Sequence, residues 1–383
     1  MSGKFPRGRT AISGAATFGV GETPGYTALE MAAKAGLLAV ADAGLQIGDV
    51  DGLFVCLPED FFSGLSLAEY FGLSPRFTDN NRTGGSSFMS HMITAALALE
   101  AGYIDTALIA YGSNQRSSGG KLVTSIKSNA WDLPYRPMFP VSSYALAAAR
   151  HMHEFGTTRA DMAAVAVAAR AWANTNPEAF ARGPLTIDDC LSSRMISSPI
   201  SVRDCCLVTD GAAAIVMTRM DRARDLRHAP VPVLGAAAAT WWNAIAQADN
   251  VTITAAAESG PRAYAAAGVA PTDIDVVQVY DAFTISTILF LEDLGFCPKG
   301  EGGRFVSDGC IAPGGSLPVN TNGGGLSYCH PGMNGLFSII ESVRQIRGTA
   351  ANQIPDVYHT LSHGNGGTLS SQATVILGHI STL

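Results

Sequence analysis

An internal repeat is the feature of this sequence that most constrains its fold. Residues 39–55 (AVADAGLQIGDVDGLFV) align without a gap with residues 263–279 (AYAAAGVAPTDIDVVQV), and seven of the seventeen aligned positions are identical. Each segment has the pattern of an Ala-rich helix, a Gly stop, a short linker with Asp and an apolar strand. Because the two copies lie about half a chain apart, we expect two related α/β halves rather than a solenoid of short repeats.

Two further matches follow in the same order. AEYFGLSP at 68–75 matches EDLGFCP at 292–298 in its Gly-x-x-Pro ending, and the Gly-rich NNRTGGSSF at 80–88 matches NTNGGGLSY at 320–328. A chance likeness between two Ala-rich helices is the alternative explanation for the first match. Three matches in one order favour a duplication.

Apolar segments alternate with helical ones, as in TALIAY at 106–111 and AAIVM at 213–217. This alternation predicts mainly parallel sheets covered by helices. The predicted fold class is therefore α/β, with two duplicated halves. We place the N-terminal half at residues 1–112 with 205–229, and the C-terminal half at 230–383.

The stretch between the halves, residues 113–204, is predicted to be an inserted loop domain. It begins irregularly, and helical patterns follow at 142–155 and 159–173. A long insert on an α/β core is typically a lid, a binding loop or an interface.

Composition excludes several classes of function. Only 15% of the residues are charged, which predicts much buried surface and a subunit interface. The net charge of −7, without a basic run, argues against nucleic acid and anionic membranes as partners. No apolar stretch reaches the roughly 18 residues of a membrane span, and no signal peptide is visible. The seven cysteines lack CxxC spacing, so we expect reduced thiols in a cytoplasmic protein and no metal site.

Five segments carry a family resemblance. They are DGAAAIVM at 210–217, VYDAF at 279–283, LGFCPKGEGGRFVSDG at 294–309, NGGGLSYCHPGMNG at 322–335 and SHGNGG at 362–367. In this order they resemble the thiolase superfamily, and within it the sterol-carrier-protein and lipid-transfer-protein branch. The resemblance covers nearly the whole chain, and the C-terminal motifs are specific only as a set. It implies a thiolase-like fold, with two duplicated βαβαβ-type halves packed as a layered α/β/α/β/α core.

The chain departs from that family at the nucleophile. Thiolases carry a reactive cysteine at a turn that opens a buried helix, where the helix dipole lowers its pKa. Counting back from Gly85, Arg82 takes the place of this cysteine. Ser86 and Ser87 are expected to cap the following helix. Covalent acyl transfer needs an activated nucleophile, and Cys329 is the one remaining candidate by sequence.

Four residues are the candidate catalytic groups. Tyr280 follows an apolar strand, at the carboxyl end where open α/β sheets bind ligands. Tyr280 and Tyr328 together resemble the tyrosine pair of bacterial steroid side-chain aldolases. The resemblance also implies that His330 helps to hold a thioester oxygen. His363, or a neighbour in a register left open, stands where thiolases have an acid/base cysteine. Asp281 is expected to cap a helix rather than act as an acid.

The candidate substrate-binding residues are Arg82, Gly324, Gly325 and Gly366. The glycines would allow close approach of the backbone to a ligand. Arg82 fits either a contact with a ligand carboxylate or phosphate, or a structural ion pair. No metal is expected, and no cofactor besides the coenzyme A of the substrate.

These residues favour retro-aldol cleavage of a β-hydroxyacyl-CoA to a ketone and a shorter acyl-CoA. The reaction needs a base for the β-hydroxyl, an oxyanion site for the thioester enolate and an acid for the carbanion. A thiolase-type acetyl-CoA acyltransferase and a non-catalytic acyl-CoA-binding subunit are the alternatives. The resemblance further implies a homodimer, a role in steroid degradation and a small partner protein with an oligonucleotide-fold (DUF35-like) domain.

Overall fold

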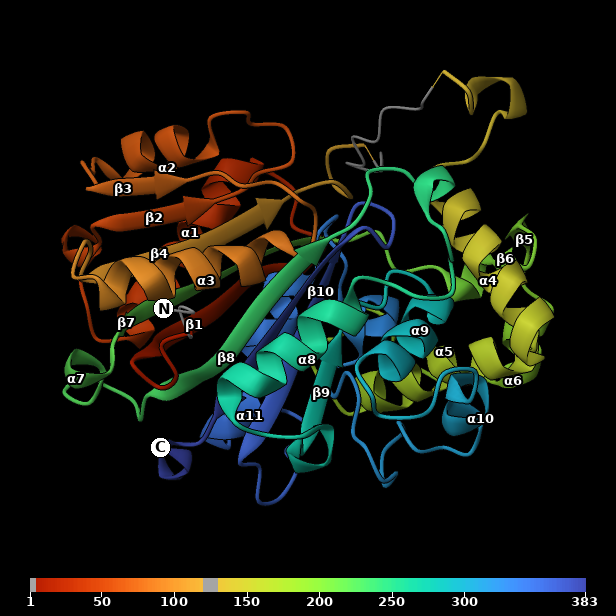
Figure 1. Cartoon of the computed structure of the whole chain (residues 1–383). Coiled ribbons are helices and arrows are strands. Elements are labelled where there is room, and N and C mark those ends of the chain that lie inside the picture. The colour runs from red at the N-terminus through yellow and green to blue at the C-terminus, as the bar shows by residue number, and fades with distance from the viewer. Residues whose placement is uncertain (1–4, 120–129) are drawn as a thin grey trace.

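Nine strands form one mixed sheet at the centre of the protein. The structure is a computed structural model, and it describes residues 5–119 and 130–383. The order across the sheet is β3-β2-β4-β7-β1-β8-β11-β10-β9 (Figure 1). The strands are β1 (Thr10–Gly21), β2 (Gly52–Val55), β3 (Phe77–Asp79), β4 (Thr106–Ser113), β7 (Asp210–Arg219), β8 (Val231–Thr240), β9 (Val276–Val279), β10 (His359–Gly366) and β11 (Ser371–Gly378).

The sheet consists of two halves with the same strand order. The first half runs β3-β2-β4-β7-β1, and the second runs β9-β10-β11-β8 from its outer edge inward. A parallel bridge from Val277 to Val319 stands where β3 pairs with β2 in the first half. Only two residue pairs, Ala11 with Pro232 and Ile12 with Val231, join β1 to β8. The duplicated fold predicted from the repeat is confirmed.

Helices form three layers around the two half-sheets. Helices α3 and α11 contact strands of both halves and therefore lie between them, whereas α1 packs on the first half and α8 on the second. This gives the expected α/β/α/β/α layering. The helices of the two halves are α1 (Ala28–Asp42), α2 (Ser63–Phe71), α3 (Ser87–Glu100), α7 (Met220–Ala223), α8 (Ala256–Ala267), α9 (Thr284–Asp293), α10 (Gly302–Ser307) and α11 (Gly335–Arg347).

The repeat extends to individual hydrogen bonds. Asp51 accepts two consecutive backbone N–H groups at the start of β4, at 2.9 Å each. Asp275, its counterpart, accepts the corresponding pair at the start of β10, at 2.7 and 2.8 Å. The glycine stops Gly44 and Gly268 both adopt positive φ, 76° and 71°. The identities in the repeat are therefore residues that fix the helix-to-strand turn and the next strand's position.

The expectation of mainly parallel sheets is wrong. Among the named strands, pairing is parallel only for β2–β3, β2–β4 and β9–β10. The central strands β4, β7, β1, β8, β11 and β10 pair antiparallel. The reason is connectivity: the chain leaves β4 through the insert and returns in β7 from the opposite direction, and β10 and β11 form a hairpin.

The insert between β4 and β7 forms a helical unit beside the second half. Its helices are α4 (Val141–Phe155), α5 (Arg159–Asn174) and α6 (Ile187–Leu191), followed by the hairpin of β5 (Met195–Ser197) and β6 (Ile200–Ser201). The first two agree with the predicted helices to within one residue. Part of the predicted insert, residues 120–129, lies outside the described residues. Figure 1 shows the segment around the 3-10 turn η2 (Leu133–Tyr135) projecting away from the body.

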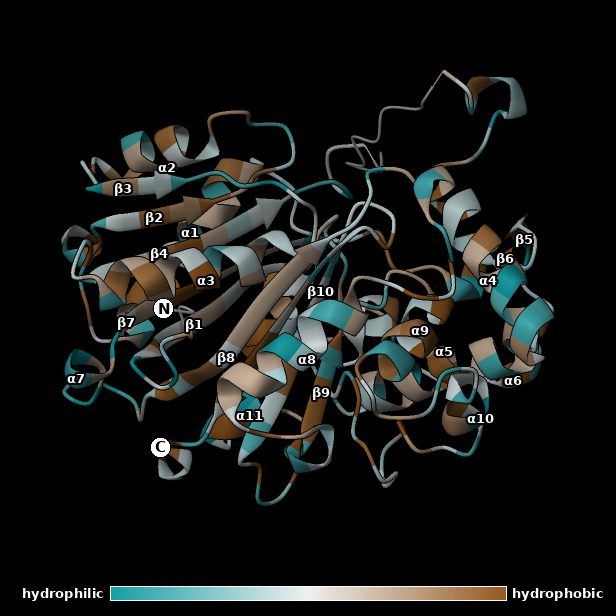
Figure 2. Ribbon diagram, viewed as in Figure 1, coloured by the Kyte–Doolittle hydropathy of each residue, from teal (hydrophilic) through white to brown (hydrophobic). Residues whose placement is uncertain are grey.

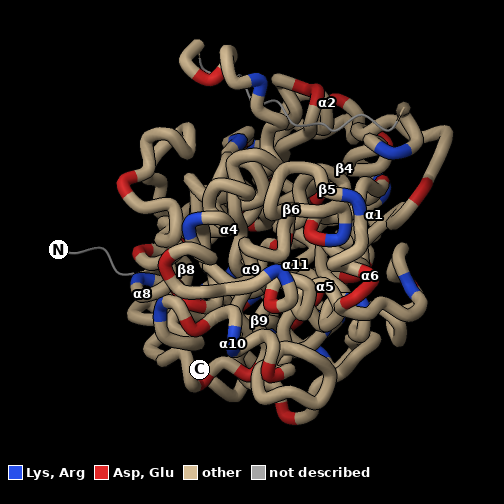
Figure 3. Tube along the Cα trace, turned by 90° about the vertical axis from the view of Figure 1, so that its right-hand side faces the viewer, with Lys and Arg blue, Asp and Glu red and all other residues tan. Residues whose placement is uncertain are grey.

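Burial and charge follow the layers. Every residue of β2 and β4 is buried, and apolar colour in Figure 2 concentrates on the strands and on the helix faces that cover them. Figure 3 shows acidic and basic residues interspersed on the face that carries α4, α5 and α6. In the part of the chain that the structure describes, no helix is long and apolar enough to span a bilayer.

Candidate active site

A cavity of about 1120 Å³ lies where the carboxyl ends of β9 and β10 meet the turn before α3. Ligand pockets commonly have volumes of roughly 300–1,000 Å³, so this one accommodates a bulky molecule. Most of its wall is apolar and comes from the insert, the loop after β8 and the turn after β9. The apolar side chains include Phe139, Val141, Leu146, Trp242, Ile245, Val251 and Phe283.

Tyr280 lies in the cavity wall directly after β9, as the sequence predicted. Its backbone N–H donates to the carbonyl of His363 at 3.0 Å, which extends the β9–β10 pairing by one residue. Its hydroxyl lies 3.4 Å from the carbonyl of Gly332. Burial raises the pKa of this phenol well above its ordinary value, and the neighbouring Cys206 and Tyr144 raise it further. Tyr280 is therefore protonated at neutral pH and can donate a hydrogen bond.

The ring of Tyr280 occupies space that only glycine leaves open. A Cβ atom on Gly85 would lie 1.9 Å from Cε2 of the ring. Gly85 belongs to the turn that leads into α3, and it also lines the cavity. The Gly-rich turn of the first half therefore leaves space for an aromatic ring from the second half.

His330 is the second polar group of the cavity wall. Its ring packs edge to face against Tyr280, with centroids 5.4 Å apart. Its backbone is fixed on both sides: its N–H donates to Thr209 Oγ1 at 3.0 Å, and its carbonyl accepts from Gln115 Nε2 at 2.8 Å. Within the described residues, the buried Nε2 has no hydrogen-bond partner. Burial lowers the pKa of the imidazole to about 4, so the ring is neutral at pH 7.

Asp281 positions the turn that delivers His330. Its carboxylate accepts the backbone N–H of Gly325 at 2.6 Å and of Leu326 at 3.2 Å, at the start of the π-helical turn Gly324–Tyr328. Gly324 has φ of +59°, and a Cβ there would lie 2.2 Å from the carboxylate. Burial raises the pKa of Asp281 to about 6, although these backbone bonds oppose the shift. The capping role expected for Asp281 holds, but the element it caps is this turn.

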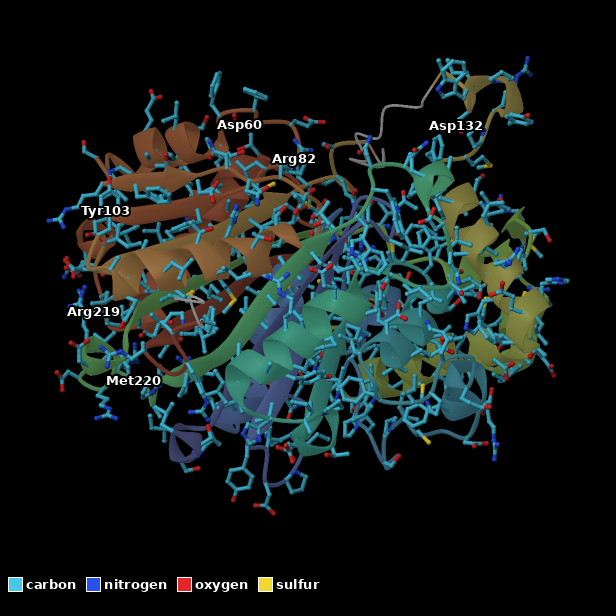
Figure 4. The ribbon with its side chains drawn as sticks, in the orientation of Figure 1. Asp60, Arg82, Tyr103, Asp132, Arg219 and Met220 are labelled. Atoms are coloured by element: carbon cyan, nitrogen blue, oxygen red, sulfur yellow. The ribbon has the colours of Figure 1, made fainter. Side chains whose placement is uncertain are left out.

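Arg82 lines the cavity beside Thr83, Gly84 and Gly85. In Figure 4 it lies at the upper edge of the first half, and Asp132, another cavity residue, lies on the projecting segment of the insert. The charge of Arg82 also reaches inward, since it opposes the rise in the pKa values of Cys56 and Tyr111. A cationic side chain thus stands at the mouth of the turn where the resemblance places a nucleophile.

Two thiols line the cavity that no sequence motif had singled out. They belong to Cys205 and Cys206, in the segment that returns from the insert. Burial raises the pKa of Cys205 to about 12 and that of Cys206 well above its ordinary value, so both are thiols at neutral pH. Cys329 is fully buried, its pKa is raised in the same way, and it lies outside the cavity wall. None of the three has the low pKa of an activated nucleophile.

Tyr328 does not reach this cavity. Only 1% of its surface is exposed, and its ring packs among the core side chains around Phe337. Its hydroxyl donates to Glu178 at 3.1 Å, and Glu178 also binds Arg344 at 2.9 Å. Glu178 and Arg344 line a separate cavity of about 570 Å³. The π-helical turn points Tyr328 inward, so the two tyrosines are not brought together at the site.

His363 also lies outside the cavity wall. Its Nε2 is 2.8 Å from Gln372 Oε1 and its Nδ1 is 2.9 Å from Thr374 Oγ1, so both ring nitrogens have partners. Burial lowers its pKa to about 4. Two residues on, Asn365 does line the cavity, together with Gly366. Asn365, rather than His363, is therefore the residue of this pair that lines the cavity.

The predicted glycines also differ in whether they line the cavity, and Ser86 does not cap α3 with its side chain as expected. Gly366 lines the cavity, and a Cβ there would lie 1.6 Å from the carbonyl of Thr83. Gly324 and Gly325 lie outside the wall and make room for Asp281 rather than for a ligand. Ser86 is the N-cap residue of α3 but makes no capping hydrogen bond with its side chain; its hydroxyl instead donates to Ser371 at 3.0 Å.

The N-terminus of α3 points its first turn at the cavity, since Gly84 and Gly85 immediately precede the helix. Unpaired backbone N–H groups and the helix dipole favour negative charge at such a position. Among the described residues, no group of three or more His, Cys, Asp or Glu side chains is arranged to hold a metal ion. The wall thus combines a phenol, a neutral imidazole and a helix N-terminus around an apolar space.

Comparison with known proteins identifies thiolase-like relatives. A family profile described as "Thiolase C-terminal domain-like" matches residues 237–379. The chain is 36% identical to the 17-hydroxy-3-oxo-4-pregnene-20-carboxyl-CoA lyase of Mycobacterium tuberculosis, over 95% of this chain and 98% of the relative. It is 32% identical to an acetyl-CoA acetyltransferase of Methanothermobacter thermautotrophicus, over 96% and 98%. The solved structure "Ltp2-ChsH2(DUF35) aldolase" superposes with a TM-score of 0.89 at 34% identity, covering 97% of this chain and 98% of that one.

Proposed function

The chain belongs to the thiolase superfamily, in the group that contains the steroid side-chain-cleaving aldolases, and from this premise we propose that it is a lyase. The proposed reaction is retro-aldol cleavage of a β-hydroxyacyl-CoA to a ketone and a shorter acyl-CoA. The acyl group we propose is bulky and polycyclic, as the name of the mycobacterial relative suggests. The reaction draws on no cofactor besides the coenzyme A of the substrate.

One observation carries the proposal. A protonated phenol and an unpartnered neutral imidazole, Tyr280 and His330, face one large apolar cavity at the N-terminus of α3. Such a set can move protons and stabilise an oxyanion, which are the requirements of a retro-aldol step. It does not supply the activated nucleophile that a covalent acyl-enzyme needs.

His330 is proposed to take the proton of the β-hydroxyl. Its Nε2 is the polar atom of the wall that has no hydrogen-bond partner among the described residues. As the O–H bond breaks, its electrons form the ketone carbonyl, the Cα–Cβ bond breaks and its electron pair passes into the thioester enolate. The negative charge that develops on the enolate stabilises the imidazolium formed beside it.

Tyr280 is proposed to donate its hydrogen bond to the thioester oxygen. Its raised pKa keeps the phenol protonated, which suits a donor better than a base. The ring is held between Gly85 and His330, so the hydroxyl has only to turn its hydrogen from the Gly332 carbonyl, 3.4 Å away, to the thioester oxygen. Preorganised donors of this kind commonly contribute about 10²–10³ in rate.

The direct test is cleavage of β-hydroxyacyl-CoA thioesters that carry a tertiary hydroxyl, with products measured by liquid chromatography and mass spectrometry. We expect ketone and shortened acyl-CoA in equal amounts. The panel includes polycyclic and linear acyl groups and is tested with and without a DUF35-domain protein. If no member were cleaved, the proposal would be refuted.

A thiolase-type acyltransferase is the second candidate, because a relative named as an acetyl-CoA acetyltransferase matches the chain over nearly its whole length. That reaction would pass through an acylated cysteine, and Cys205 and Cys206 are the thiols in the cavity wall. Intact-mass measurement after incubation with acetyl-CoA distinguishes the two candidates. We expect no added acetyl group; an acetylated Cys205 or Cys206 peptide would favour the acyltransferase.

We also propose that the chain binds a DUF35-domain partner, since the name of the solved aldolase includes such a domain, and that it works as a homodimer, as its low share of charged residues suggests. The insert offers an apolar surface beside the cavity: Trp131 and Tyr135 are 84% and 85% exposed, and Leu133 and Met138 are also exposed. Light scattering of the chain alone and mixed with such a partner tests both statements. A monomer that binds no DUF35 protein would contradict them.

A further inference from the structure

A chain of four buried polar side chains ends at the cavity. His363 Nε2 donates to Gln372 Oε1 at 2.8 Å, and Gln372 Nε2 donates to Asn365 Oδ1 at 2.7 Å. Asn365 Nδ2 then donates to the hydroxyl oxygen of Tyr144 at 2.7 Å. The first three residues belong to the β10–β11 hairpin, and Tyr144 belongs to α4 of the insert. The hydrogen bonds therefore connect the core sheet to the helix that forms the far wall of the cavity.

The direction of these hydrogen bonds fixes the proton of Tyr144. Because Asn365 donates to the phenol oxygen, the hydrogen of Tyr144 must point elsewhere. In the described part of the chain, the phenol has no acceptor for that hydrogen. Tyr144 lines the same cavity as Tyr280 and His330, and its ring stacks on Phe283 with centroids 4.2 Å apart. The free donor is thus held rigidly at the wall of the site.

The surroundings keep this phenol protonated. Burial raises the pKa of Tyr144 to about 12, partly opposed by the hydrogen bond from Asn365. Tyr144 also contributes to the raised pKa of Tyr280, which places the two phenols within electrostatic range of each other. A protonated phenol backed by an amide donor can release a proton to a stronger base, and the same amide stabilises the phenolate that remains.

We propose that Tyr144 is the acid that protonates Cα of the thioester enolate, and that Asn365, Gln372 and His363 are its positioning residues. This inference rests on the proposed retro-aldol reaction and supplies its missing final step. The O–H bond of Tyr144 breaks, the enolate electron pair forms the new Cα–H bond, and the carbonyl of the product thioester is restored. The phenolate regains a proton from solvent, and the proton that His330 took from the β-hydroxyl returns to solvent, so the overall reaction is balanced.

The final step can be measured alone, in reverse, on the acyl-CoA product. In D₂O, the phenolate would remove a Cα proton from propionyl-CoA and return a deuteron, which mass spectrometry detects without any ketone present. We expect the wild-type protein to catalyse this exchange and Tyr144→Phe to slow it by about 100-fold or more, the range found for general acids and bases. Tyr264→Phe is the matched control, because Tyr264 is a buried tyrosine whose hydroxyl binds Leu294 outside the cavity.

His330→Ala separates this inference from the proposed function. His330 acts on the β-hydroxyl, which propionyl-CoA lacks, so this variant should lose cleavage. Its exchange should be reduced in part, because His330 packs against Tyr280, but should stay well above that of Tyr144→Phe. Exchange by Tyr144→Phe at the wild-type rate, in a protein that still cleaves its substrate, would overturn the role of Tyr144 alone. A wild-type protein that neither cleaves nor exchanges would refute the proposed function. Thermal melting of each variant shows whether the fold is intact.

Asn365→Asp tests the positioning role without a change in volume. The carboxylate would accept the hydrogen of Tyr144 instead of donating to its oxygen, so the proton would turn away from the substrate. We expect cleavage to fall by about 100-fold at pH 7 and to recover partly as the pH is lowered, since a protonated carboxyl can donate to the phenol oxygen again and turn the hydrogen of Tyr144 back toward the substrate. A merely structural role for Asn365 predicts no such recovery. A pH-independent rate would therefore contradict the positioning role proposed for Asn365.

Discussion

The two halves of this molecule share a scaffold but not a chemistry. Val55 and Val279 close the repeat, so the next residues correspond: Cys56 in the first half and Tyr280 in the second. Cys56 is buried beneath the turn before α3, whereas Tyr280 lies in the cavity wall. The Gly-rich turn of the first half leads directly into α3, while that of the second carries the π-helical turn and His330 before α11 begins.

This difference teaches how a duplicated fold builds one site. The first half supplies backbone and space: the N-terminus of α3 and the missing Cβ of Gly85. The second half supplies three polar side chains of the cavity wall, Tyr280, His330 and Asn365. If the two halves contribute in this way, substitutions that remove a polar group from the second half will abolish catalysis. Equivalent substitutions in the first half will act through packing.

The largest effect is expected for His330→Ala. Loss of the base should lower kcat for cleavage by about 10³-fold, within the range for general base catalysis, with little change in folding. Steady-state rates and thermal melting measure the two quantities. A variant that retains more than a tenth of the wild-type kcat would show that the base lies elsewhere. It would also contradict the assignment of the chemistry to the second half.

Tyr280→Phe should lower kcat by about 10²-fold to 10³-fold, because it removes the proposed oxyanion donor while the ring still fills the space beside Gly85. Cys56→Ala, at the corresponding position of the first half, should change kcat less than threefold and lower the melting temperature instead. Equal losses in kcat for the two variants would break the comparison.

Tyr328→Phe distinguishes the sequence-based expectation from the geometry. A catalytic Tyr328 would make this variant as slow as Tyr280→Phe. Its position in the core, bound to Glu178, predicts instead a loss of stability with kcat within about threefold of wild type. Stopped assays for product and a denaturant titration of the same preparation give both values.

Gly85→Ala tests the contribution of the first half. The added Cβ would meet the Tyr280 ring at 1.9 Å, so the ring must move. Overpacking of this kind costs roughly 1–3 kcal/mol, and we expect a roughly 10-fold loss of kcat from the displaced phenol. Gly48→Ala is the matched control, since a Cβ there has nothing within 4 Å and no unusual φ. Wild-type kcat in Gly85→Ala would show that the ring position does not matter.

The repeat was sufficient to predict two related α/β halves, because its identical residues are those that fix local geometry, such as Asp51 and Asp275 at the strand starts. It could not predict the pairing directions in the centre of the sheet, which depend on where the insert returns the chain. The polar residues of the VYDAF and Gly-His-Pro-like motifs, Tyr280 and His330, were found from sequence because both follow elements that the fold places at one edge.

The remaining site residues depend on contacts that no local pattern records. His363 and Asn365 share one face of β10, so strand alternation cannot show which of them reaches the cavity. Asn365 reaches it because it lies nearer the end of the strand. Tyr144 meets Asn365 from 221 positions away, through a helix of the insert. Tyr328 points inward because a π-helical turn, which a Gly-rich sequence does not specify, sets its direction.

The smallest expected effect is that of pH on catalysis. The pKa of His330 is lowered from its ordinary 6.5 to about 4, so the neutral base is fully present above about pH 5. We therefore expect His330 itself to lower kcat/KM only as the pH approaches 4. A change near pH 6 that is absent from Asp281→Asn would belong to Asp281, whose pKa is about 6. Stability has the same sign: the buried imidazoles His91, His330 and His363 bind protons more readily in the unfolded chain, so stability is full above pH 6.5 and declines as the pH falls toward 4. Melting temperatures recorded at each pH separate loss of fold from loss of the base. An inflection of kcat/KM near pH 6.5 in a fully folded protein would mean that His330 is solvated like a surface histidine. The second half would then not provide the water-excluding wall on which the proposed base depends.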